Sequence, residues 1–170
     1  MPTEIEVFIG FTKDDDFTLL KQTLEAWAAL VGPEHISAVQ CNPKKFETAR
    51  RVAADNMAKG DHYLLVDLGC VPTGSTDIDM MLERMEQDDG LAIGGLSLST
   101  GRSADVTQPI PTGVRMCRKG AVTKWLPKQT DSYDKEHAQS AWISRTNRIS
   151  DDPVTVVWPD LYYTHIRKAS

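Results

Sequence analysis

Four polar side chains of the sequence are candidates for chemistry: Asp67, Asp134, Glu136 and His165. A carboxylate can act as a general base or bind a divalent cation, and an imidazole can also do either. Each residue has a structural explanation as well. Asp67 could cap a turn, Asp134 and Glu136 could be ordinary first-turn acids of a helix, and a lone His165 is a weak metal signal.

The setting of Asp67 favours a site. It directly follows the run from Tyr63 to Val66, which predicts a strand buried on both faces, and residues 5–11 and 35–41 predict two more such strands. Ligands of parallel α/β sheets bind at the carboxyl ends of the strands. We therefore expect an α/β domain with a mostly parallel sheet, in which these three strands are neighbours and Asp67 opens into the main cleft.

The helices between these strands have clear start signals. The acidic triplet at residues 14–16 precedes an apolar stripe that ends near Val31, so it is expected to cap the helix N-terminus rather than to bind metal. Asn42 followed by Pro43 predicts the start of a second helix, which ends before Gly60. Arg50 and Arg51 lie on this helix in a polar face, where solvation is as good an explanation as a phosphate contact.

The second half of the chain has a looser pattern. Thr76 is expected to cap a helix, and residues 91–98, 113–118 and 154–158 predict further strands. Residues 99–112 are rich in Ser, Thr, Gly and Pro and predict a long loop that orders over a ligand, whereas residues 133–145 predict a helix. The whole chain, residues 1–170, is interpreted as one domain.

Bulk composition narrows the function classes. The chain has 170 residues and a formal net charge of −5, which disfavours general nucleic-acid binding. Its three cysteines lack CxxC spacing, which favours a reducing, cytoplasmic location over a disulfide framework or a zinc knuckle. Neither a signal peptide nor an apolar run long enough to span a bilayer is expected.

The segment from Phe46 to Gly74, FETARRVAADNMAKGDHYLLVDLGCVPTG, resembles the part of A-type (GT-A) glycosyltransferases in which an Arg-bearing helix leads to a buried strand and an Asp-x-Asp motif. The resemblance implies a Rossmann-like nucleotide-diphospho-sugar transferase fold that takes a nucleotide-sugar donor and an acceptor of unknown identity. It implies that Phe11 and Thr12, at the end of the first strand, hold the nucleotide base, and that Arg50 contributes to donor binding.

The same resemblance assigns roles near the other motifs. Gly113, in the segment PTGVR, resembles the small-residue turn that lets an acceptor sugar approach. Asp134, with Glu136 as the second choice, resembles the catalytic base of inverting members, and His165 resembles a further metal ligand of some members.

The metal motif departs from the family pattern, because it reads Asp67-Leu68-Gly69. Glycine offers no side-chain oxygen, so Mn²⁺ or Mg²⁺ is expected to bind weakly, through Asp67 and His165. A metal-free clamp made by Arg115, Arg118 or Arg167 is the alternative.

Two other functions stay open at this stage. One is a non-catalytic nucleotide-sugar-binding or scaffolding domain that kept the fold. The other is a nucleotidyltransferase, which the Gly-poor first loop disfavours.

Overall fold

The computed structural model describes residues 4–74, 76–88, 91–99, 113–120 and 155–166. Asp134, Glu136 and Arg167, the segment 100–112 of the predicted loop and the helix predicted over 133–145 lie outside the described residues. The elements are, in chain order, β1 (Glu6–Phe11), α1 (Phe17–Val31), the 3₁₀ turn η1 (Pro33–His35), β2 (Ile36–Gln40), the 3₁₀ turn η2 (Pro43–Lys45), α2 (Phe46–Met57), β3 (His62–Val66), β4 (Cys70–Pro72), α3 (Ile78–Gln87), β5 (Ile93–Leu98), β6 (Val114–Arg118) and β7 (Thr155–His165).

The strands of the described part form one seven-stranded sheet in the order β2-β1-β3-β6-β5-β7-β4. β1 lies between β2 and β3 and is parallel to both, so the predicted neighbourhood of the first three strands is confirmed. β6 runs antiparallel to both β3 and β5, and β7 is parallel to β5. The predicted α/β fold is therefore present, with a mixed sheet whose first three strands are the parallel unit.

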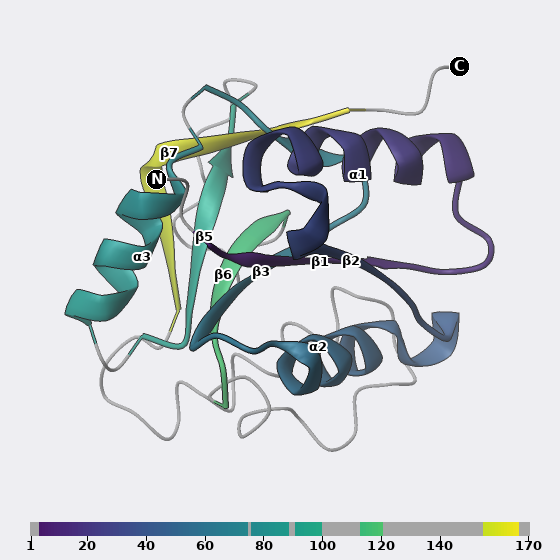
Figure 1. Ribbon diagram of the computed structural model, residues 1–170, viewed down its shortest axis with the longest axis horizontal. Coiled ribbons are helices and arrows are strands. Elements are labelled where there is room, and N and C mark those ends of the chain that lie inside the picture. Colours follow the sequence, from purple (N-terminus) through teal and green to yellow (C-terminus); the bar gives the residue numbers. More distant parts are fainter. Residues whose placement is uncertain (1–3, 75, 89–90, 100–112, 121–154, 167–170) are drawn as a thin grey trace.

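Helices cover both faces of this sheet (Figure 1). Side chains of α1 and α3 pack with Val7 and Ile9 of β1 in the larger core. On the opposite face Ala54 of α2 and Ala58, which follows the helix, pack in a second cluster with Phe8. Alternate residues of a strand point to opposite faces, so each central strand is buried on both sides.

The helix caps follow the sequence signals with one exception. The Asp16 side chain accepts hydrogen bonds from the first turn of α1, and Asn42 caps η2, which leads into α2. Thr76 was wrongly predicted to cap α3. The cap is its neighbour Asp77, whose carboxylate accepts from the backbone N–H of Met80. The Thr76 hydroxyl is used elsewhere, since it donates to the carbonyl oxygen of Tyr162 at 2.6 Å.

Within the described residues, no helix has both the length and the apolar character needed to cross a bilayer.

Gly94 of β5 lies directly under the Trp158 ring of β7, and a Cβ at position 94 would come within 2.1 Å of that ring. We predict that Gly94→Ala lowers the free energy of unfolding by about 1–3 kcal/mol, because the indole must move out of a packed core. Gly74→Ala is the matched control, since a Cβ there meets no atom within 4 Å. Urea unfolding of both variants tests this, and equal midpoints for the two would contradict it.

Candidate functional site

The candidate site lies at the carboxyl ends of the three parallel strands. The backbone N–H of Cys41, just after β2, donates to the carbonyl oxygen of Phe11 at 2.8 Å and so joins the ends of β2 and β1. Asp67 follows β3 at the same edge. The edge therefore gathers the segments that follow β1, β2 and β3.

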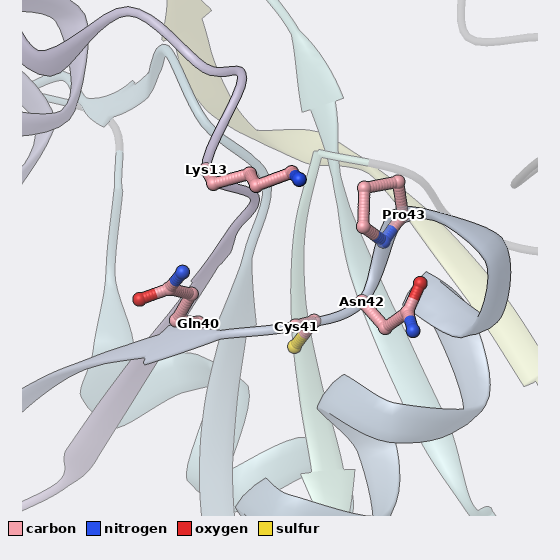
Figure 2. A pocket seen from close by; sticks show the side chains of 5 residues that line it. All are labelled: Lys13, Gln40, Cys41, Asn42 and Pro43. Atoms are coloured by element: carbon pink, nitrogen blue, oxygen red, sulfur yellow. The ribbon is translucent and has the colours of Figure 1, made fainter.

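An open pocket with a volume of about 470 Å³ lies at this edge (Figure 2). Its lining comes from the loop after β1 and the end of β2: Lys13, Gln40, Cys41, Asn42 and Pro43. Figure 2 shows that the Lys13 amine and the Gln40 amide come from neighbouring segments on one side of the pocket, with Asn42 and Pro43 on the other. The pocket thus combines a cation, two amides and the apolar edge of a proline ring.

The predicted base-binding residues lie beside this pocket. Phe11 is the last residue of β1 and packs partly against the larger core. The backbone N–H of Thr12 donates to the Asp15 carboxylate at 2.6 Å, which closes the loop in front of α1. Asp15 therefore shapes the loop that carries Lys13. Neither Lys13 nor Gln40 was singled out from the sequence, because an isolated Lys and Gln near strand ends carry no local signal.

The turn that carries Asp67 is held by α1. Within the turn, the backbone N–H of Cys70 donates to the Asp67 carbonyl oxygen at 3.0 Å. The Thr23 hydroxyl accepts from the backbone N–H of Gly69 at 3.0 Å, and the Trp27 indole N–H donates to the Cys70 carbonyl oxygen at 2.8 Å. Thr23 and Trp27 are both fully buried, so these bonds fix the turn against the helix.

The Asp67 carboxylate is shared by two arginines and a backbone amide. Its Oδ1 pairs with the guanidinium groups of Arg50 and of Arg115, the latter at 3.4 Å. Its Oδ2 accepts from the backbone N–H of Gly113 at 3.0 Å. The arginine side chains are 1% and 0% exposed, whereas the Asp67 side chain is 23% exposed. The carboxylate therefore forms the solvent-facing cover of the two guanidinium groups.

The charge of Asp67 is secured by these partners. Burial alone raises the pKa of a carboxyl group, but the positive charges of Arg50 and Arg115, with the hydrogen bonds from Arg50 and Gly113, hold the pKa of Asp67 well below its usual range. Asp67 is consequently ionised at any pH near neutrality.

Arg50 reaches Asp67 by crossing β1. A Cβ at Gly10 would lie 3.1 Å from the Arg50 Cδ and 3.2 Å from the Phe46 ring, so the absence of a side chain at Gly10 makes room for both. The guanidinium carbon lies 5.1 Å from the centre of the Phe46 ring. Of the two explanations left open for Arg50 and Arg51, the solvated face is wrong, since both residues are buried.

Gly113 lies beside Asp67. In addition to its N–H bond, its carbonyl oxygen accepts from the Asp67 backbone N–H at 2.7 Å. Its φ is +84°, and a Cβ would come within 2.2 Å of the Tyr163 hydroxyl. Position 113 therefore has room only for glycine, with the phenol of Tyr163 directly against it.

His165 lies opposite Gly69, not among the partners of Asp67. It pairs with Cys70 in the β4–β7 ladder, and its Nε2 would lie 3.2 Å from a Cβ at position 69. Gly69 has a φ of +87°, and the same Cβ would come within 2.8 Å of the Ile166 carbonyl oxygen. A side chain at position 69 is therefore strained whatever its chemistry.

The residues do not fit the Mn²⁺ or Mg²⁺ site implied by the resemblance. Hard cations require several oxygen ligands, but both Asp67 carboxylate oxygens are engaged, Gly69 has no side-chain oxygen, and its carbonyl oxygen accepts from the Ile166 N–H. Across the described ranges, no group of three or more His, Cys, Asp or Glu side chains could hold a metal.

Of the three arginines suggested as a metal-free clamp, Arg115 lies at the site and Arg167 lies outside the described residues. Arg118 donates to the carbonyl oxygens of Met85 and Leu91, at 2.6 Å and 3.0 Å, and so joins β6 to the end of α3 and the segment that follows it. That role is structural, and the suggestion for Arg118 was wrong.

Solved structures share this fold. A glycosyltransferase involved in the glycosylation of the major capsid of PBCV-1 superposes with a TM-score of 0.63 at 12% identity, covering 98% of this chain and 95% of that one. The mannosyltransferase PcManGT from Pyrobaculum calidifontis, solved with GDP-Man and Mn²⁺, gives 0.63 at 10% identity, covering 96% of this chain and 57% of that one. The fold is that of the nucleotide-sugar glycosyltransferases.

The likeness extends to a second enzyme class. A CMP:2-keto-3-deoxy-manno-octonic acid synthetase complexed with CTP gives a TM-score of 0.54 at 13% identity, covering 95% of this chain and 90% of that one. The sequence matches no family model and no curated protein. The similarities to solved structures confirm the predicted resemblance at the level of the fold. A fold alone does not define a reaction.

We predict that Asp67→Asn lowers the free energy of unfolding at pH 7 by about 3 kcal/mol, because it removes the anion from two buried cations. The folded-state pKa of Asp67 lies below its unfolded value of about 3.9. The ionised carboxylate therefore adds stability that is fully present above that pH and is lost as the pH falls below it. The difference between the two proteins should shrink in urea unfolding below pH 4. A difference independent of pH would contradict the assignment.

Proposed function

We propose that this protein binds a nucleotide-sugar donor at the edge formed by β1, β2 and β3 and transfers the sugar to an acceptor. The observation that carries the proposal is the Asp67, Arg50 and Arg115 cluster at the end of β3, at the same edge of the sheet as an open polar pocket. Solved neighbours with this fold hold GDP-Man, UDP or UDP-GlcNAc. This supports a ligand of the same class here.

The geometry suggests an orientation for the donor. The base and ribose would occupy the pocket near Lys13, Gln40 and Asn42. The side-chain amides of Gln40 and Asn42 can both donate and accept hydrogen bonds, and the Lys13 ammonium group can donate them. Since β1 separates β2 from β3 and neighbouring strands lie about 4.8 Å apart, the diphosphate would then extend across the end of β1 towards Asp67. The sugar would lie near Gly113, as the resemblance implies.

The transfer itself needs a base and a way to accept charge on the leaving group. The acceptor hydroxyl loses its proton as its oxygen bonds to the anomeric carbon, and the bond from that carbon to the diphosphate oxygen breaks with its electron pair. Asp134 is the proposed base and Glu136 the second choice, both from the resemblance alone. They lie outside the described residues, so substitution has to test them.

A non-catalytic nucleotide-sugar-binding domain is the second candidate, favoured by the loss of a carboxylate at Gly69. Incubation with a sugar nucleotide and measurement of released nucleoside diphosphate separates the two functions. Turnover that is lost in Asp134→Asn and kept in Glu136→Gln supports transfer with Asp134 as the base. Binding without turnover supports the second candidate.

We also propose that the chain forms a single domain and that the protein is located in the cytoplasm.

Lys13 provides a direct test of the pocket. We predict that Lys13→Ala weakens binding of UDP or GDP about three- to tenfold, the loss expected for one hydrogen bond to a charged or polar group. Lys21→Ala is the matched control, because Lys21 lies on α1 with an exposed side chain paired only loosely with Glu25, at 3.9 Å. Calorimetry on both variants provides the measurement. Equal affinities in the two variants would remove the pocket from the donor site.

A further inference from the structure

The cluster at the end of β3 holds its charges in an arrangement unsuited to a cation. We infer that the positive charge facing the donor's diphosphate comes from Arg50 and Arg115, and that Asp67 is a positioning residue and internal anion that the diphosphate partly displaces. This inference rests on the proposed function, and it names how the same site recognises its ligand.

The contacts of Asp67 are those of an anion held by cationic and amide donors. A divalent cation bound to Oδ1 would have to share that oxygen with two guanidinium groups of its own sign, and Oδ2 is held by the Gly113 N–H. A carboxylate with cationic partners on one oxygen and an amide on the other acts as an acceptor for these groups. Asp67 therefore acts as the counter-ion of the two arginines and not as a metal ligand.

The two guanidinium groups are deeply buried. The side chains of Arg50 and Arg115 are 1% and 0% exposed, so little solvent reaches them and their field is weakly screened. An anion that comes within reach of these groups is therefore attracted more strongly than it would be by exposed arginines.

The neighbourhood of Cys117 supports this grouping. Burial raises the pKa of the Cys117 thiol to about 11, and the charges of Arg115, Arg51 and Arg50 act to lower it. All three arginines therefore lie near Cys117 of β6, on the face of the sheet covered by α2.

The unequal contacts of the two arginines indicate which one changes partner. The Arg115 contact with Asp67 is long, at 3.4 Å, whereas Arg50 is closely paired and also stacks on Phe46. A phosphate oxygen that replaces Asp67 Oδ1 at Arg115 exchanges one anion for another, so the buried cation is never left uncompensated. Asp67 and the ligand thus compete for the same guanidinium group.

This competition makes predictions opposite in sign to those of a metal site. If Asp67 bound the metal, Asp67→Asn would weaken nucleotide binding and abolish any effect of Mn²⁺. If Asp67 competes with the diphosphate, the same substitution binds UDP or GDP at least as tightly as the natural sequence, because it removes the competing anion. Arg115→Gln should then weaken binding at least tenfold, whereas Arg115→Lys, which keeps the charge but not the planar guanidinium, should weaken binding less.

The experiment is calorimetry of the full chain with UDP and GDP, in EDTA and in Mn²⁺. Circular dichroism and thermal melting first establish that each variant is folded, with Arg115→Lys keeping the test valid if Arg115→Gln fails to fold. Arg84→Gln is the matched control, since Arg84 lies on α3 and forms its ion pair with Asp160. It should leave affinity unchanged.

The expected result is equal affinity of the natural sequence in the two buffers, with Asp67→Asn equal or tighter. Binding that requires Mn²⁺, or that is lost in Asp67→Asn while the fold is kept, would overturn the inference and leave the proposed function standing. If neither nucleotide binds in either buffer, the proposed function fails and the inference with it.

Discussion

The shared carboxylate of Asp67 is the interaction on which the rest of the site depends. Two guanidinium groups under a sheet would be costly to bury without an anion, and Asp67 provides one that stays ionised near neutral pH. This pairing places demands elsewhere. Gly10 must lack a side chain so that Arg50 can cross β1, and Gly113 must bring its N–H to the second carboxylate oxygen.

The same site is also fixed from the opposite face of the sheet. Thr23 and Trp27 of α1 bond to the turn that follows Asp67, so the position of the carboxylate is set by a helix that does not contribute charge. Because Gly69 occupies the left-handed region and a Cβ there would come within 2.8 Å of the Ile166 carbonyl oxygen, the turn has no space for a second carboxylate. The turn geometry and the absence of a cation ligand are therefore one feature of the fold.

Local signals allowed the sequence to predict the first half of the fold. Apolar runs predicted β1, β2 and β3, and Asp16 and Asn42 capped as expected because capping involves residues only a few positions apart. The position of Asp67 also followed from its place after β3. Its partners did not, because Arg50 and Arg115 are 17 and 48 residues away and meet it only through the crossover and the β3–β6 register. The burial of Arg50 and Arg51 also rules out the solvated helical face that was one of their two explanations.

Asp67 links stability and binding at a single atom. Without a ligand, Oδ1 keeps two buried cations compensated and oriented, which stabilises the fold. In the proposed complex the same oxygen occupies the position where a phosphate oxygen is to bind. A stronger ion pair between Asp67 and the arginines in the free protein therefore weakens ligand binding. Sites commonly carry such a conflict between stability and function. The 3.4 Å contact of Arg115 is consistent with a compromise, since it is close enough to hold the charge in place and long enough to be exchanged. A divalent cation would resolve the conflict differently, by making the carboxylate and the diphosphate partners of one ion. With glycine at position 69, this chain has the geometry for direct exchange between two anions.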